Sequence, residues 1–400
     1  MNFVFCNSKF EETMDRIINF DHGSATQPLP EVVASMMPFL RDNYGNPSSM
    51  HVLGQQAKAA LDKARAQVAA LIHAEPEEII FTASGSESNN FALKGVAFGN
   101  RKKGDHIIVS AIEHFSVLQA AKSLEKLGYQ ITQIPVDNDG LVDPDEVKKA
   151  ITDKTILISV HHANPEIGTI EPIEEIGRIA REKGVLFHTD AIQTVGTIPV
   201  DVKKLNVDLL SLAANTFYGP KGAAALYIRK GTRINPLIDG GTQEGGRRAG
   251  TENLLGIVGM GTAAELAARD MEKRIAQVQP LRDLMIELIE QKIDHVSLHG
   301  HRTQRLPNNV NFGFEFIEGE SILLFLGMSN IIASSGSACT SKALKASHVL
   351  LAIGVPHAIA NGTILFTLGI DNTEEDVRLL GDKLPPIVDR LRSMSPLYKK

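Results

Sequence analysis

The sequence predicts an α/β fold, and two observations support this. From about residue 75, short apolar runs recur along the chain and are separated by longer amphipathic segments. The runs are almost continuously apolar, which is typical of strands buried on both faces. Strands that alternate with helices form a mostly parallel sheet covered by helices on both sides.

The expected elements follow in chain order. Strands of the main sheet are expected at residues 79–82, 106–110, 155–160, 185–188, 208–212 and 223–228. Helices are expected between them at residues 116–127, 143–151 and 173–183. Around Pro280 a long helical stretch begins, followed by apolar runs at 310–312, 331–333 and 364–367, which indicate a second, smaller α+β domain. Residues 1–18 form an extension, with a short helix expected over 11–18.

Composition excludes several classes of function. The chain has 400 residues, a formal net charge of −6 and no run rich in lysine and arginine, so neither a nucleic-acid nor a membrane partner is expected. Its apolar stretches are too short to span a bilayer, and its N-terminus lacks the pattern of an export signal. Two cysteines, Cys6 and Cys339, are too few for a disulfide framework. A cytoplasmic location is therefore expected.

Seven short motifs stand along the chain. They are Gly-Asn-Pro-Ser-Ser-Met-His (45–51), Phe-Thr-Ala-Ser-Gly-Ser-Glu-Ser-Asn-Asn (81–90), Glu-His (113–114), His-Thr-Asp-Ala-Ile-Gln (188–193), Phe-Tyr-Gly-Pro-Lys-Gly (217–222), Gly-Thr-Glu-Asn (250–253) and Ser-Ser-Gly-Ser-Ala-Cys (334–339). Together they resemble the NifS/IscS-type cysteine desulfurases, pyridoxal-phosphate (PLP) enzymes of aminotransferase class V. The resemblance runs from about Phe20 to the C-terminus.

The resemblance implies a type I PLP-enzyme fold and a homodimer. A large domain at residues 19–275 would carry a mostly parallel seven-stranded sheet, and its first residues could pack on the small domain. A small α+β domain at residues 276–400 would carry the loop with Cys339. Residues 1–18 would precede both domains as the extension.

The resemblance also assigns cofactor-binding positions. Gly85 and Ser86 would contact the PLP phosphate, in a turn whose free N–H groups and helix dipole suit an anion. His114 would stack on the pyridine ring. Asp190 would pair with the ring nitrogen and Gln193 would meet the phenolic oxygen. Thr251 would reach the phosphate of the neighbouring subunit.

Cys339 is the expected catalytic sulfur carrier, together with His114 as a catalytic residue. In the family the corresponding thiolate takes up sulfur as a persulfide and passes it on, which requires an accessible, mobile segment. The polar, glycine-containing surroundings at residues 334–341 fit that requirement better than the alternative, a buried apolar thiol. Cys339 could also face metal as a ligand of an iron–sulfur cluster shared with a scaffold protein.

The sequence departs from the family at positions that touch cofactor or substrate. Thr216 replaces the lysine that holds PLP as a Schiff base, and a hydroxyl cannot form an imine. Asn215 and Ala213 replace two phosphate ligands, a histidine and a serine. Pro165 replaces an asparagine, and Leu365 replaces the arginine that grips the substrate carboxylate. PLP is therefore expected to bind non-covalently or not at all.

We expect a sulfur-transfer protein of iron–sulfur cluster assembly, degenerate in PLP catalysis, that works beside an IscU-type scaffold or another sulfur acceptor. Two alternatives remain open. One is a slow but genuine cysteine desulfurase, which converts L-cysteine to alanine plus persulfide with a substitute base. The other is a non-catalytic dimeric module whose pocket holds another anion.

Overall fold

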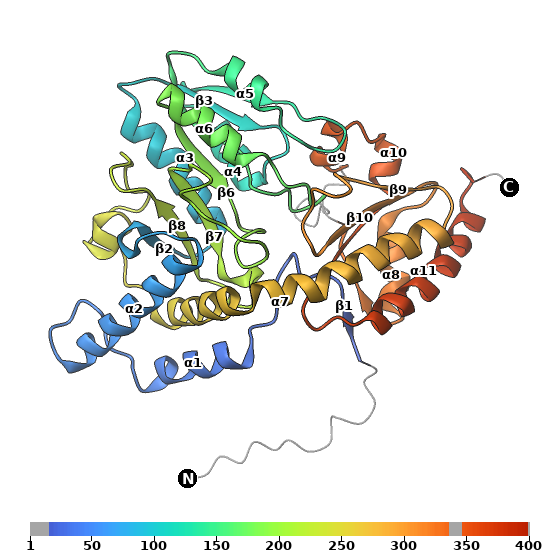
Figure 1. Cartoon of the computed structure of the whole chain (residues 1–400), viewed down its shortest axis with the longest axis horizontal. Coiled ribbons are helices and arrows are strands. Elements are labelled where there is room, and N and C mark those ends of the chain that lie inside the picture. The colour runs from blue at the N-terminus through green and yellow to red at the C-terminus, as the bar shows by residue number, and fades with distance from the viewer. Residues whose placement is uncertain (1–15, 336–345, 399–400) are drawn as a thin grey trace, which may run out of the picture.

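The computed structural model describes residues 16–335 and 346–398. Two α/β units of unequal size lie along one long helix, α7 (Leu254–Lys292), which runs across both (Figure 1). The first half of α7 packs into the core of the large unit, and its second half packs into the core of the small unit. No helix in the described ranges is both long and apolar enough to cross a membrane.

The large unit is built on a seven-stranded sheet. Its strands, in spatial order, are β2 (Ile79–Thr82), β8 (Ala224–Ile228), β7 (Leu209–Ala213), β6 (Leu186–Asp190), β5 (Thr155–Ser159), β3 (His106–Ser110) and β4 (Gln130–Ile134). Only β8 runs antiparallel to its neighbours. This confirms the predicted α/β class with a mostly parallel seven-stranded sheet.

Helices cover both faces of that sheet (Figure 1). They are α2 (Val52–Leu71), α3 (Gly85–Asn100), α4 (Phe115–Glu125), α5 (Pro144–Ala150) and α6 (Ile173–Lys183). Helix α1 (Pro30–Arg41) packs against α7 instead, and the unit also has 3₁₀ turns η1 (Pro76–Glu78), η2 (Ala214–Thr216) and η3 (Gln243–Gly246). Helix α6 shows why the pattern predicted it: Ile173, Ile176 and Ile179 line one buried face. The helix ends at Gly184, which takes a left-handed conformation with φ of 66°.

The small unit has a separate core. Its sheet has the order β12 (Thr363–Thr367), β10 (Asn309–Phe314), β9 (Val296–Leu298), and all pairs are antiparallel. A parallel pair joins β1 (Ile18–Asn19) to β11 (Ile331–Ile332). The helices are α8 (Gly319–Gly327), α9 (His348–Ala352), α10 (His357–Ala360) and α11 (Glu374–Met394).

Three local expectations differ from the structure. Ile18 is not helical: it pairs with Ile331 and is buried, because its side chain completes the small core. The edge strand β4 was not predicted, since its residues are mostly exposed or half-buried and lack a continuous apolar run. Helix α7 begins at Leu254, well before Pro280, which the helix accommodates in its interior. The expected domain boundary after residue 275 falls inside this helix and stays a prediction.

Candidate functional site

The turn that follows β6 is the centre of the candidate site. Asp190 ends this strand and is only 7% exposed. Its Oδ1 accepts a hydrogen bond from the backbone N–H of Ile192 at 3.0 Å, so the carboxylate is fixed by the turn it begins. Gln193 lies on the same turn, and its Nε2 donates to the carbonyl oxygen of Gly23 at 3.0 Å. Parallel strands end together at this edge, where α/β proteins bind their ligands.

A chain of hydrogen bonds connects Asp190 to His114. Asn89 Nδ2 donates to Asp190 Oδ2 at 2.6 Å and to Ser116 Oγ at 2.8 Å. Ser116 Oγ in turn lies 2.7 Å from His114 Nδ1. The backbone N–H of Ser116 also donates to this nitrogen, so Nδ1 is an acceptor in this chain of bonds.

The sequence reasoning missed Asn89 and Ser116 as members of this chain. A signal was available: Asn89 lies four residues after Gly85, and residues at that spacing share one face of a helix. Ser116 lies two residues after the histidine that caps α4, where a hydroxyl can reach back to the cap.

Helix α3 begins at the other side of the turn, at the position where the sequence predicts an anion cradle. Gly85 and Ser86 are its first two residues, and the Ser84 side chain caps it by accepting from the N–H of Glu87. Gly85 is buried against Ile192: a Cβ at position 85 would lie 2.1 Å from Ile192 Cδ1. Only glycine therefore allows this close approach between the helix start and the turn.

The carboxylate of Glu87, which no sequence argument singled out, also belongs to the cradle. Its Oε2 accepts from the N–H of Ala83 at 2.9 Å, and its Oε1 pairs with Arg248 Nε at 2.9 Å. Arg248 therefore offsets a negative charge that would repel an anion at the helix N-terminus. Thr251 lies three residues further along the same loop and is exposed.

The three replaced positions after β7 border this cradle. Ala213 is buried, and its Cβ lies 3.8 Å from where a Cβ on Gly85 would stand. Asn215 accepts through its backbone oxygen from Thr26 N at 2.8 Å. The hydroxyl of Thr216 lies 2.6 Å from the carbonyl oxygen of Ile192 and 3.0 Å from that of Ala213. Since its hydrogen is directed to the backbone, the Thr216 hydroxyl has no hydrogen left to donate to a ligand.

The other two replaced positions lie outside the Asp190–His114 chain. Pro165 lies in a turn, and its carbonyl oxygen accepts a hydrogen bond from Asn309 Nδ2 at 3.2 Å. Leu365 is in β12, is 7% exposed and pairs through its backbone with Ser334. In the described residues, no hydrogen bond joins either position to the chain between Asp190 and His114.

A buried ionic triad of Glu113, His161 and Glu171 lies next to the turn that contains His114. The sequence analysis did not predict this triad. His161 lies between two carboxylates, with Nδ1 at 3.4 Å from Glu113 and Nε2 at 3.3 Å from Glu171. Burial disfavours its charge, but the two carboxylates outweigh burial and raise the pKa of His161 to about 10. Burial raises the pKa of Glu113. The triad therefore holds a histidinium next to Glu113, the residue that precedes His114.

Cys339 lies outside the described residues, as does Cys6. The segment after Cys339 resumes at α9, which Ser347 caps by accepting from the N–H groups of Val349 and Leu350. Ser347 Oγ donates to Glu166 Oε2 at 2.7 Å, and burial raises the pKa of Glu166 to about 7. Among the described histidines, cysteines and acidic residues, no group of three is arranged to hold a metal ion.

The residues present fit PLP in part. The start of α3, with a glycine that a Cβ would block, suits its phosphate, and the Asp190 carboxylate suits a protonated ring nitrogen. The position for covalent attachment does not fit, because Thr216 is hydrogen-bonded to the backbone and cannot form an imine. A parallel α/β domain with this edge and a smaller second domain define a type I PLP-enzyme fold.

Comparison with known proteins places the chain within that class. The family described as "Aminotransferase class-V" matches residues 18–380. The chain is 54% identical to "Cysteine desulfurase IscS" of Dictyoglomus turgidum over 97% of this chain and 98% of that protein. It is 52% identical to the protein of the same name from Methanosarcina thermophila, over 99% and 98%. A solved structure titled "NIFS-LIKE PROTEIN" superposes with a TM-score of 0.89 at 37% identity, over 94% of this chain and all of that one.

The chain belongs to the NifS/IscS-type cysteine desulfurases of the class-V aminotransferase family. Its fold and the predicted family resemblance are thereby confirmed. The roles of the individual site residues stay predictions.

Proposed function

We propose that this protein transfers sulfur during iron–sulfur cluster assembly and does not itself release sulfur from free L-cysteine. Membership of the cysteine desulfurase family supports a role in sulfur transfer. The observation that carries the second half of the proposal is the hydroxyl of Thr216. It is bonded to the carbonyl oxygen of Ile192 at 2.6 Å, at the position where the family resemblance implies a lysine. Leu365 adds to this, since an apolar side chain cannot pair with a substrate carboxylate.

Cys339 would carry the sulfur by exchange with a persulfide on another molecule. Its thiolate attacks the terminal sulfur of the donor persulfide, a new S–S bond forms at Cys339, and the donor leaves as a thiolate. No net oxidation or reduction accompanies this step. The acceptor is an IscU-type scaffold or another sulfur acceptor protein, and a cluster iron bound to Cys339 remains part of the prediction.

PLP, when bound, supplies an electron sink for carbanion chemistry. Gly85 and Ser86 would hold its phosphate, while His114, Asp190 and Gln193 would hold its ring. In this chain that binding would be non-covalent. The second candidate, a slow desulfurase, draws its support from the unbroken hydrogen-bond chain between Asp190 and His114, which would orient a ring even without a lysine.

A homodimer would complete the site. Helix α1 and the segment after it expose large apolar side chains in the isolated chain, namely Val33, Met37, Leu40, Tyr44, Met50 and Val52. A concentration of such side chains on one region of the surface is typical of a protein interface. Thr251 is exposed on the loop that also contains Arg248, the partner of Glu87. In a dimer it would then reach the phosphate site of the neighbouring subunit.

Two measurements on one preparation test the function. Purified protein, supplied with PLP and L-cysteine under reducing conditions, should release no sulfide above a Cys339→Ser blank. The same protein, mixed with a low-molecular-weight persulfide and then a scaffold protein, should pass labelled sulfur through Cys339. Sulfide release that depends on L-cysteine and on Cys339 would establish the slow desulfurase instead. Failure of both reactions would leave the non-catalytic binding module.

A further inference from the structure

Arg274, on α7, is a cation without an acceptor. In the ranges that the structure describes, no carboxylate or carbonyl accepts a hydrogen bond from its guanidinium, and its Nη1 is fully buried. Its Cζ stands over the ring of Tyr218, 5.2 Å from the centroid. The acidic residue one turn earlier, Asp270, is already engaged by both Nε and Nη2 of Arg269. A buried N–H of a charged group without a partner is costly, which calls for an explanation.

The explanation lies in the cavity that Arg274 lines. This cavity has a volume of about 40 Å³ and lies where the turn after β7 meets the end of β12 and the loop before β10. Thr216 and Tyr218 line it from the large unit, and Asn308 and Ile370 line it from the small unit. A single water molecule needs about 10–15 Å³ of such space, so an ion of chloride size fits.

Tyr218 contributes a second donor. Its Oη accepts from the backbone N–H of Ile370 at 2.8 Å, and its own hydrogen has no acceptor among the described residues. Burial raises the pKa of Tyr218 to about 12, so the phenol keeps that hydrogen at neutral pH. A charged donor and a neutral donor thus line the same small space, which is the arrangement that an anion requires.

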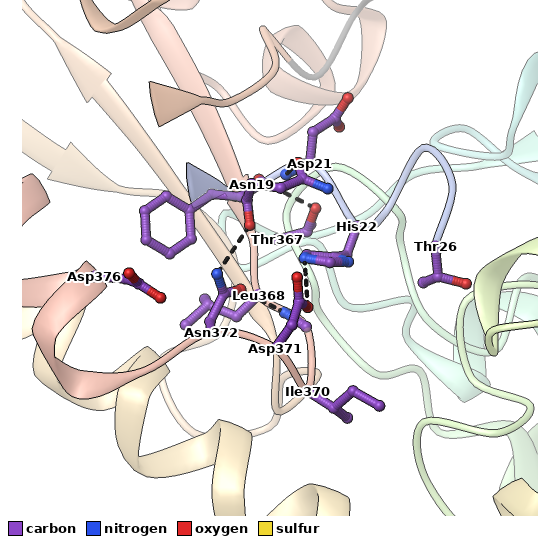
Figure 2. Close-up of polar contacts among 12 residues, drawn as sticks. Asn19, Asp21, His22, Thr26, Thr367, Leu368, Ile370, Asp371, Asn372 and Asp376 are labelled. Atoms are coloured by element: carbon purple, nitrogen blue, oxygen red, sulfur yellow. Dashed lines mark hydrogen bonds and ion pairs between the residues drawn. The ribbon is translucent and has the colours of Figure 1, made fainter. Parts of the chain in front are cut away.

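The remaining polar groups limit what can bind. His22 also lines the cavity, is 4% exposed, and has no aligned hydrogen-bond partner on either ring nitrogen. Burial lowers the pKa of His22, so the ring is neutral. The carboxylate of Asp371 lies 3.2 Å from Nε2 of His22 (Figure 2). The Asp371 side chain is 60% exposed, however, and does not line the cavity. The buried Oδ1 of Asn308 is an acceptor without a donor.

We propose that this cavity binds a chloride-sized monovalent anion between Arg274 and Tyr218. Two ions share the required charge and size. Chloride comes from the solvent, whereas hydrosulfide would come from sulfur chemistry, and that second source rests on the function proposed above. Hydrosulfide also carries a hydrogen that can be donated to Asn308 Oδ1, which chloride lacks. The ion would join the turn containing Thr216 to the small unit and so stabilise the contact between the two.

Thermal unfolding tests the site in solution. At constant ionic strength, sodium chloride, bromide and hydrosulfide should raise the melting temperature of the intact protein saturably, whereas sodium gluconate, whose anion is too large, should not. Arg274→Gln should weaken the apparent anion affinity by about tenfold or more, because the charged partner is lost. Lys273→Gln, which removes one positive charge from an exposed position of the same helix, should respond like the wild type. If Arg274→Gln does not fold, Tyr218→Phe takes its place in the test. It keeps the ring under Arg274, removes only the hydroxyl donor and should also weaken the apparent anion affinity.

Crystals soaked in bromide give a direct readout. An anomalous peak within hydrogen-bond distance of Arg274 supports the proposal, and hydrosulfide that competes with bromide more strongly than chloride identifies the sulfur source. A water molecule in the cavity, or equal responses of wild type and Arg274→Gln to every salt, would overturn it. The halide measurements need neither Cys339 nor PLP, so their failure can be told apart from failure of the proposed sulfur transfer.

Discussion

Ser334 and Leu365 are joined by two reciprocal backbone hydrogen bonds, Ser334 N to Leu365 O at 3.0 Å and Leu365 N to Ser334 O at 2.7 Å. The residue in the arginine position of the family is therefore paired directly with the chain that leads into the Cys339 segment. A change at position 365 acts on two parts of the site at once. In the function proposed above, it would alter the charge that faces a substrate carboxylate, and it would act at the strand paired with the residues that lead to Cys339.

Thr216→Lys should restore covalent binding of PLP. The start of α3, Asp190 and His114 are in place, so a lysine at position 216 supplies the missing amine. We expect a yellow protein after incubation with PLP, and a borohydride-stable adduct that peptide mass mapping assigns to residue 216. The unsubstituted protein should lack the internal-aldimine absorbance and should form no borohydride-stable adduct under the same treatment. An adduct on Lys221 of the unsubstituted chain would contradict our account of the site.

Adding Leu365→Arg to Thr216→Lys should restore turnover of L-cysteine. The arginine gives the substrate carboxylate a charged partner, which is worth about 1.5–3 kcal/mol in kcat/KM. Alanine formation at several cysteine concentrations measures this gain. If the single lysine variant reached the same kcat/KM as the double variant, Leu365 would not be the reason that substrate binding is weak.

Cys339 should react in the native protein. Small polar residues flank it in the sequence, and a sulfur carrier must reach a partner's sulfur. Iodoacetamide is expected to alkylate Cys339 without denaturant, and Cys339→Ser should abolish sulfur transfer while the dimer remains intact. Cys6→Ser is the matched control and should change neither. Alkylation of Cys339 that occurs only after denaturation would remove the main support for sulfur transfer.

Gly85→Ala should destabilise the protein through a single contact. The new Cβ would lie 2.1 Å from Ile192 Cδ1, and overpacking of this kind typically costs about 1–3 kcal/mol. Ile192→Val removes the Cδ1 atom and should lower that cost, so the two substitutions should be coupled in a double-mutant cycle measured by urea unfolding. Additive effects would mean that α3 and the Asp190 turn are not in close contact.

Glu166→Gln should change how stability depends on pH. Burial raises the folded-state pKa of Glu166 from 4.5 to about 7, so the unfolded state loses this proton first as pH rises. The wild type should therefore lose stability between pH 4.5 and 7, by up to about 3 kcal/mol, and the neutral amide should not. Unfolding free energies of both proteins across this range test the prediction. The exposed Glu77→Gln should follow the wild type.

The class of fold could be predicted because the strands of the large sheet are buried on both faces. That burial makes β3 and β5 nearly continuous apolar runs, and such runs are visible in a sequence. The predicted strand at residues 106–110 and helix at residues 173–183 coincide with β3 and α6. Edge strand β4 has no such run and was missed.

The site residues could be predicted only where they lie in a short motif that resembles one of the family. Gly85, His114, Asp190 and Gln193 are found by resemblance, and the structure gathers them around one turn. The ionic triad of Glu113, His161 and Glu171 was not found, because three separate segments contribute one residue each. Arg274 was missed for a different reason. It is distinguished by the absence of a hydrogen-bond acceptor for its guanidinium among the described residues, and a sequence does not record that.

The pairing of β1 with β11 has a consequence for synthesis on the ribosome. Ile18 leaves the exit tunnel early but meets Ile331 only after more than 300 further residues have been added. The seven-stranded sheet is complete once β8 has emerged, so the large unit can fold while β1, which belongs to the small unit, is still without its partner strand. Closure of the small unit is therefore a late event, and a nascent chain that stalls before β11 would carry Ile18 and Phe20 uncovered.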